Sequence, residues 1–171
     1  MTASVLRQLD TNAVTWVCLR RRRHLDLVMR WCTRAGNGTL WWLIGISTFL
    51  LDPRGGPIVA RLAIAFAFEL SLYKVLKQSL RRPRPYIVLA AVTNAVAPPD
   101  EFSFPSGHTA AATVVLTVVG SVYPGAIFVL APLAALIAIS RVYLGMHYPS
   151  DVVAGALLGI AAGSIALVIP I

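Results

Sequence analysis

A serine, a glycine and a histidine stand together at Ser106, Gly107 and His108, between a proline and a long apolar run. The apolar run predicts a helix, and the first turn of a helix has free backbone N–H groups and the positive end of the helix dipole. Gly107 would let the backbone approach a ligand closely. These residues therefore predict a helix start that holds an anion.

Three cationic side chains, Lys77, Arg84 and Arg141, interrupt or flank apolar stretches of the chain. Ionisable residues are costly within a membrane, so each is a functional candidate. Their N–H groups suit an oxyanion with several equivalent oxygens, such as phosphate. The sequence offers no cluster of carboxylates or cysteines as metal ligands, so we expect neither a metal ion nor a cofactor at this site.

A second histidine, His147, precedes Asp151 by four residues. Asp151 would fix the tautomer of the His147 ring and leave its other nitrogen free as a nucleophile. His108 could act as a general acid, and Ser150 is expected to cap the helix that starts beside it. Together these residues predict phosphoryl transfer through a phosphohistidine.

The elements that position these residues are apolar. Of the 171 residues, 57% are hydrophobic and 13% are charged, whereas a soluble domain carries about 25% charged residues. We therefore expect an all-helical bundle in a lipid bilayer. Five segments are expected to span it, at about 39–52, 57–79, 107–123, 125–145 and 152–169. The polar residues form three groups, at 77–84, 106–108 and 141–151. If each apolar segment crosses the membrane once, all three groups lie on the same face.

The first 35 residues have a different composition. Seven of the fifteen basic residues of the chain fall in the first 34 positions: Arg7, Arg20, Arg21, Arg22, Arg23, Arg30 and Arg34. Apolar residues recur among them near helical spacing, so we expect one or two amphipathic helices that lie on the membrane surface. A poorly ordered basic tail is the alternative. The chain is then one domain over residues 1–171, with an N-terminal region at 1–35 and a helical core at 36–171.

The polar residues resemble the motifs of the type-2 phosphatidic acid phosphatase superfamily, the membrane lipid phosphate phosphatases. That family carries K-x-x-x-x-x-x-R-P, then P-S-G-H, then S-R-x-x-x-x-x-H-x-x-x-D. The three motifs match Lys77 to Pro85, Pro105 to His108, and Ser140 to Asp151, in order and with every fixed position present.

By this resemblance, His147 attacks phosphorus, Asp151 orients His147, and His108 protonates the leaving oxygen and then activates water. The resemblance implies that the phosphate oxygens are held by Lys77, Arg84, Ser106, Gly107 and Arg141. It also implies catalysis without a metal, and a helical bundle whose core is shared with the soluble vanadium-dependent haloperoxidases. Five confident spans suggest that the first family helix is interfacial in this chain.

The function implied is hydrolysis of a lipid phosphate or diphosphate at a bilayer, expected to be the bacterial inner membrane. The partners are the lipid substrate and the membrane rather than nucleic acid, and neither the lipid nor the oligomeric state follows from the sequence. The N-terminal arginines favour a site on the cytoplasmic face. A phosphotransferase with the same site remains an alternative. So does a non-catalytic lipid-binding or transport protein, although it would not need both histidines and Asp151.

Four other charged residues have simpler expected roles. Glu69 lies deep in the second apolar segment, and we expect its carboxyl group to be hydrogen-bonded between helices, with Tyr73 one turn away as the nearest partner. Arg81 and Arg82 fall outside the fixed motif positions and are expected to contact lipid head groups. Asp100 is expected to be a solvated loop charge.

Overall fold

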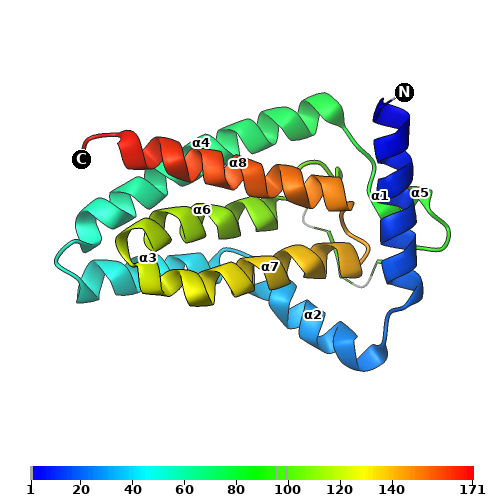
Figure 1. Ribbon diagram of the computed structural model, residues 1–171, viewed down its shortest axis with the longest axis horizontal. Coiled ribbons are helices and arrows are strands. Elements are labelled where there is room, and N and C mark those ends of the chain that lie inside the picture. The colour runs from blue at the N-terminus through cyan, green and yellow to red at the C-terminus, as the bar shows by residue number, and fades with distance from the viewer. Residues whose placement is uncertain (1, 95, 99) are drawn as a thin grey trace.

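Five long helices run roughly along one axis of the molecule (Figure 1). The computed structural model describes residues 2–94, 96–98 and 100–171. The long helices are α3 (Thr39–Leu51), α4 (Gly55–Leu80), α6 (Gly107–Val122), α7 (Ile127–Tyr143) and α8 (Pro149–Val168), and a short 3-10 turn, η1 (Pro124–Ala126), precedes α7. The all-helical class is therefore confirmed, and each of the five segments expected to span the membrane contains a helix, with bounds that differ by a few residues.

Apolar length separates these helices into two groups. Within the part of the chain that the structure describes, two stretches are long and apolar enough to cross a membrane, Pro124–Tyr143 and Pro149–Val168. Thr39–Leu51 and Gly107–Val122 are shorter apolar helices. At 1.5 Å per residue, α3 covers only about 20 Å, against about 30 Å of hydrocarbon.

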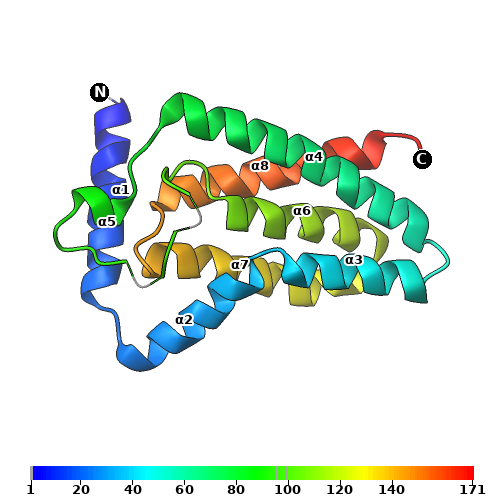
Figure 2. The ribbon, with the colours of Figure 1, turned by 180° about the vertical axis from the view of Figure 1, so that it is seen from behind.

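The N-terminal region forms two helices rather than a disordered tail. Helix α1 (Thr2–Leu19) lies across one end of the bundle, and α2 (Arg23–Ala35) leads back from it and packs on α7 (Figures 1 and 2). The short helix α5 (Pro85–Val88) lies beside α1 at the same end in both views. One end of the bundle is therefore covered by elements from two distant parts of the sequence.

Helix α6 is the centre of the bundle and packs against α4, α7 and α8. Its small and β-branched side chains are buried, among them Val114, Val115 and Val118. Helices α3 and α4 pack on each other beside it. This places the beginning of α6, which carries His108, among the ends of its neighbours.

A row of glycines lets α8 approach α6 closely. A Cβ atom at Gly155 would fall on the Ser106 carbonyl oxygen, and one at Gly163 would lie 2.8 Å from Cβ of Thr117. Small residues repeated every fourth position allow such backbone approach between membrane helices. The N–H of Ser106 consequently donates a hydrogen bond of 2.9 Å to the backbone oxygen of Asp151.

The polar residues expected to converge do lie at one end of the bundle. This end, next to α1, contains the end of α4, the start of α6 and the connection between α7 and α8 (Figures 1 and 2). The turns that join α3 to α4 and α6 to α7 lie at the opposite end, together with the C-terminus. The three groups of polar residues therefore converge at one end of the bundle, as expected, and the membrane crossings themselves stay a prediction.

Candidate active site

His147 lies in the short connection between α7 and α8 and faces two buried arginines. Its Nε2 atom is 3.3 Å from Nη1 of Arg84 and 3.4 Å from Nη2 of Arg141. Both guanidinium groups are almost fully buried. Since a guanidinium only donates hydrogen bonds, Nε2 acts as the acceptor, and the ring proton of neutral His147 belongs on Nδ1.

The surroundings of His147 also keep its ring neutral. Burial, and then the positive charges of Arg141, Arg84 and Lys77, lower the pKa of His147 well below its ordinary value. At neutral pH the ring therefore carries a free electron pair on Nε2. A free base that faces two cations is suited to attack a phosphorus atom whose oxygens those cations hold.

Asp151 lies beside His147 and is held by two other groups. Its Oδ2 atom is 3.7 Å from Nδ1 of His147, which is too long for a hydrogen bond. Oδ2 accepts a bond of 2.9 Å from the backbone N–H of Tyr148, and Oδ1 accepts one of 2.7 Å from Arg82. Asp151 thus caps the start of α8, and the expectation that Ser150 would do so is wrong.

Arg82 is an internal residue, so its expected contact with lipid head groups is wrong. Its guanidinium lies between two carboxylates, donating to Asp151 and, at 2.8 Å, to Asp10 of α1. It also lies over the ring of Tyr148, 3.9 Å from the ring centroid. Asp10 is itself buried and accepts a bond of 3.0 Å from the N–H of Ser150. An ion-pair chain therefore joins α1 to Asp151.

Asp100 is an ion-paired residue rather than the expected solvated loop charge. Its Oδ1 lies 2.6 Å from Nζ of Lys77 and 2.5 Å from Nη2 of Arg84, and its Oδ2 accepts a bond of 2.6 Å from the Tyr73 hydroxyl. Burial alone would raise the pKa of Asp100, but the bonds from Lys77 and Tyr73, with the charge of Arg84, lower it to about 2. Two of the three cations expected to hold phosphate, Lys77 and Arg84, therefore hold a carboxylate here.

The helix start that is expected to bind an anion lies where the sequence predicted it. Helix α6 begins at Gly107, and Ser106 precedes it in an extended conformation. The Ser106 hydroxyl is buried, 3.0 Å from Oγ1 of Thr109. A Cβ atom on Gly107 would lie 2.9 Å from the Tyr73 ring, so a larger residue would push α6 away from α4. The structure thus packs this helix start closely against Tyr73, whose hydroxyl accepts a hydrogen bond from Lys77 of the cation group formed by Lys77, Arg84 and Arg141.

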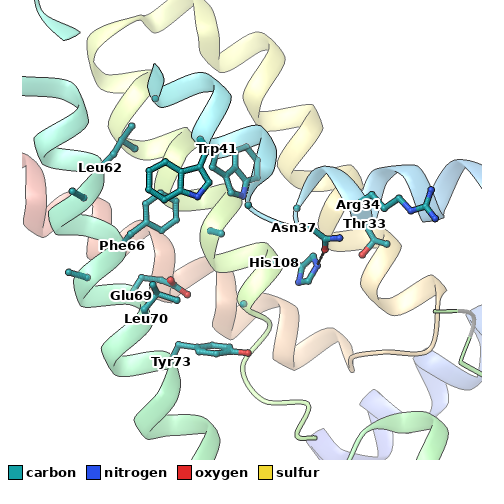
Figure 3. Close-up of a pocket in the computed structure, with 18 of the residues that line it drawn as sticks. Thr33, Arg34, Asn37, Trp41, Leu62, Phe66, Glu69, Leu70, Tyr73 and His108 are labelled. Carbon is teal, nitrogen blue, oxygen red and sulfur yellow. Dashed lines mark hydrogen bonds between the residues drawn. The ribbon is translucent and has the colours of Figure 1, made fainter. Parts of the chain in front are cut away.

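His108 is held by a residue that sequence reasoning missed. Its Nε2 atom lies 2.6 Å from Oδ1 of Asn37, in the turn between α2 and α3 (Figure 3). A Cβ atom on the preceding Gly36 would be 2.8 Å from Cδ2 of His108, so the turn packs directly on the ring. The "GNG" sequence at 36–38 was the available signal. Thr33 of α2, likewise missed, accepts a bond of 2.6 Å from Nη1 of Arg141.

A cavity of about 1430 Å³ opens from this end of the bundle along α3 and α4. His108, Arg141 and Asp100 line its polar end, and mostly apolar side chains line the rest. Glu69 is also in the wall (Figure 3). The expected hydrogen bond from Glu69 to Tyr73 is wrong, because the Tyr73 hydroxyl is bonded to Asp100 and Lys77.

Charge at the site comes from side chains. Across residues 2–94, 96–98 and 100–171, no three His, Cys, Asp or Glu side chains are grouped so that they could hold a metal ion. The positive groups that face the candidate nucleophile are Lys77, Arg84 and Arg141. Such a set of N–H donors is suited to a tetrahedral oxyanion.

Known proteins resemble both the sequence and the fold. A family model described as the PAP2 superfamily matches residues 58–170. An undecaprenyl-diphosphatase of Sulfolobus acidocaldarius is 33% identical over 124 residues, which cover 69% of this chain and 58% of that protein. The chain therefore spans little more than half the length of this curated relative.

Two solved structures are similar to this one. The crystal structure of Aquifex aeolicus LpxE has a TM-score of 0.82 and 32% identity, covering 91% of this chain and 93% of that one. A transmembrane PAP2-type phosphatidylglycerolphosphate phosphatase from Bacillus subtilis has a TM-score of 0.77 and 26% identity, covering 95% and 85%. The likeness thus includes the helices that precede residue 58.

Proposed function

Because the chain belongs to the PAP2 superfamily, we propose that it is a membrane phosphatase that hydrolyses a lipid phosphate or diphosphate through a phosphohistidine. The observation that carries this proposal is the position of His147, whose unprotonated Nε2 lies 3.3 and 3.4 Å from two buried guanidinium groups. A nucleophile and an oxyanion clamp are then in the same place.

In the first step, Nε2 of His147 attacks phosphorus while the bond from phosphorus to the lipid oxygen breaks. Lys77, Arg84 and Arg141 would neutralise the equatorial oxygens, with the Ser106 hydroxyl and the N–H group of Gly107. His108 donates its proton to the departing lipid oxygen, so that an alcohol leaves. The imidazole becomes positively charged, and the carboxylate of Asp151 beside Nδ1 stabilises that charge.

In the second step, water attacks the phosphohistidine. His108 takes a proton from the water, the bond from phosphorus to Nε2 breaks, and inorganic phosphate is released. His147 returns to its neutral form. The positive charge needed in both steps would come from the three side chains, so the reaction would proceed without a divalent metal.

The membrane arrangement is part of the same proposal. Helices α3, α4, α6, α7 and α8 would span the bilayer, and residues 1–171 would form one domain. Helix α1 would lie at the interface, because it crosses the end of the bundle and exposes Leu6, Leu9 and Trp16. The two parts are closely joined, since α1 and α2 contact the site directly.

We place this end of the bundle on the cytoplasmic face, in a bacterial inner membrane. Arginines close to membrane helices favour the cytoplasm, and the N-terminal arginines lie at the same end as the site. From there α3 would cross outward and α4 would return, which brings Lys77 back to the side of the N-terminus.

The test compares purified wild type with His147→Ala on a panel of lipid phosphates and diphosphates, with and without EDTA. We expect phosphate release by the wild type to survive EDTA, and release by His147→Ala to fall by at least about 10³-fold. His24→Ala is the matched control, because His24 is an exposed histidine of α2. Appreciable turnover by His147→Ala, or activity that needs magnesium, would contradict the mechanism.

A further inference from the structure

Two buried polar groups in the apolar part of the cavity wall have no role in the proposed mechanism. Beyond Tyr73 the wall along α4 is formed by apolar side chains such as Leu70, Phe66 and Leu62 (Figure 3). Glu69 lies among them, and Trp41 of α3 faces them across the cavity. A hydrocarbon chain needs neither a carboxyl group nor an indole N–H beside it.

Both groups are buried without partners. Glu69 is 2% exposed, its carboxyl group lines the cavity, and it makes no hydrogen bond or ion pair with another described residue. Trp41 is 7% exposed, and its Nε1 atom has no hydrogen-bond partner. Buried polar groups in proteins are almost always paired, because leaving one unpaired costs about 1–3 kcal/mol. Two unpaired groups in one cavity wall therefore point to a ligand that pairs them.

The depth of Glu69 indicates which part of a lipid it meets. Tyr73 is four residues further along α4, and its hydroxyl lies 2.6 Å from Nζ of Lys77 in the cation group. Four residues of helix are about 6 Å of rise. Glu69 is thus about one turn below the phosphate position, level with the atoms that join a lipid's phosphate to its hydrocarbon chain.

The hydrogen-bonding chemistry of Glu69 and Trp41 indicates which linker joins the phosphate of the lipid to its hydrocarbon chain. A carboxyl group accepts a hydrogen bond from a hydroxyl group, and an indole N–H donates one to an oxygen. A sugar linker, or a glycerol linker with a free hydroxyl group, offers both. A polyprenyl phosphate offers only carbon and hydrogen at this depth, and a diphosphate offers acceptor oxygens but no hydroxyl donor. We propose that Glu69 and Trp41 bind a hydroxyl-bearing linker, so that the substrate is a glycerolipid or glycolipid phosphate. This inference rests on the proposed phosphatase function.

Two substrates that differ by one hydroxyl group test whether the protein binds a hydroxyl-bearing linker. Lysophosphatidate carries a free hydroxyl on the carbon next to its phosphate ester, and the matching acyl-propanediol phosphate lacks only that group. For the wild type we expect kcat/KM about tenfold higher with lysophosphatidate, the usual effect of one buried hydrogen bond. A polyprenyl phosphate should behave like the deoxy analogue.

Substitutions of Glu69 and Trp41 test whether these two residues cause the preference for lysophosphatidate over its deoxy analogue. Glu69→Leu should abolish the difference between the two substrates and leave kcat/KM for the deoxy analogue within about twofold. Trp41→Phe keeps an aromatic ring, although a smaller one, and removes the N–H. It should reduce kcat/KM for lysophosphatidate, which provides a second test if Glu69→Leu fails to fold. Ser71→Ala is the control, because Ser71 is exposed on α4 and bonds only to the Ala67 backbone.

The outcomes separate this inference from the proposed function. Equal kcat/KM for the two substrates in the wild type, or a preference that survives both substitutions, would overturn the polar subsite while phosphatase activity stands. Absence of phosphate release from every lipid in the panel would overturn the proposed function, and the subsite with it.

Discussion

Asp100 occupies the position at which the proposed mechanism puts phosphate. Its carboxylate contacts Lys77 and Arg84 at 2.6 and 2.5 Å. A carboxylate and a phosphate both present oxygens to such donors, so they compete. With its pKa near 2, Asp100 is ionised at every pH at which the enzyme would work. Its ion pairs contribute stability above the ordinary aspartate pKa and lose it as pH falls through about 2.

Asp100→Asn should therefore strengthen the binding of inorganic phosphate. Removing the charge of a partly exposed ion pair frees on the order of 1 kcal/mol, which corresponds to about a fivefold lower inhibition constant. The inhibition constant of phosphate, measured at pH 7, tests this expectation. Glu101→Gln is the control, because Glu101 is the exposed neighbour. Weaker phosphate binding by Asp100→Asn would mean that Asp100 supports the anion site instead of competing for it.

At the scale of the elements, α1 and α2 contribute directly to the site. Asp10 reaches Asp151 through Arg82, and Thr33 holds Arg141. Neither helix belongs to the stretch at 58–170 that matches the family model. An amphipathic region that could serve only to anchor the protein thus also orients side chains of the proposed machinery.

Loss of the ion pairs that join Asp10 of α1 to Asp151 through Arg82 should lower kcat more than it weakens substrate binding. Arg82→Ala leaves two buried carboxylates without their shared cation, so we expect kcat to fall about 10- to 100-fold. KM should change by less than about threefold, because Arg82 does not face the cavity. Asp10→Asn, which keeps the shape and removes one charge, should give a smaller loss in the same direction.

Steady-state kinetics and thermal unfolding of these variants are the measurements. Arg81→Ala is the matched control, since the side chain of Arg81 is exposed and bonds only to the backbone of Gln78. A rise in KM with unchanged kcat would assign Arg82 to substrate binding. Equal losses in Arg81→Ala would show that a general loss of positive charge is responsible.

At the scale of the whole molecule, the basic N-terminal region and the site lie at the same end of the bundle. The turn between α3 and α4 lies at the other end. Since the arginines favour the cytoplasm, the proposed orientation puts residue 94 inside the cell and residue 56 outside. Both positions are exposed.

Cysteine labelling in intact cells tests that orientation. The two native cysteines, Cys18 and Cys32, are first replaced by alanine, and single cysteines are then introduced by Gly56→Cys and Asn94→Cys. We expect an impermeant maleimide to label position 56 only, and both positions after the cells are opened. Labelling of position 94 but not 56 in intact cells would reverse the orientation.

The helices and the motif residues followed from local features of the sequence. Apolar runs predicted the five long helices because the length and period of such a run largely determine a buried helix. The spacing within each motif identified Lys77, Arg84 and His147. Because successive spans run in alternating directions, these residues were expected at the same end of the bundle. The glycines at 155, 159 and 163 have the spacing that brings membrane helices close, a signal that the sequence prediction did not use.

The partners of several charged residues were decided only by the tertiary structure. Arg82 and Asp151 are 69 residues apart, Arg82 and Asp10 are 72 apart, and Asn37 and His108 are 71 apart. No period or spacing connects residues at such separations, so Arg82 and Asp100 appeared to be surface charges. Ion pairs and hydrogen bonds depend on distances of about 3 Å in space, and those distances exist only once α1, α4, α6 and α8 have packed together.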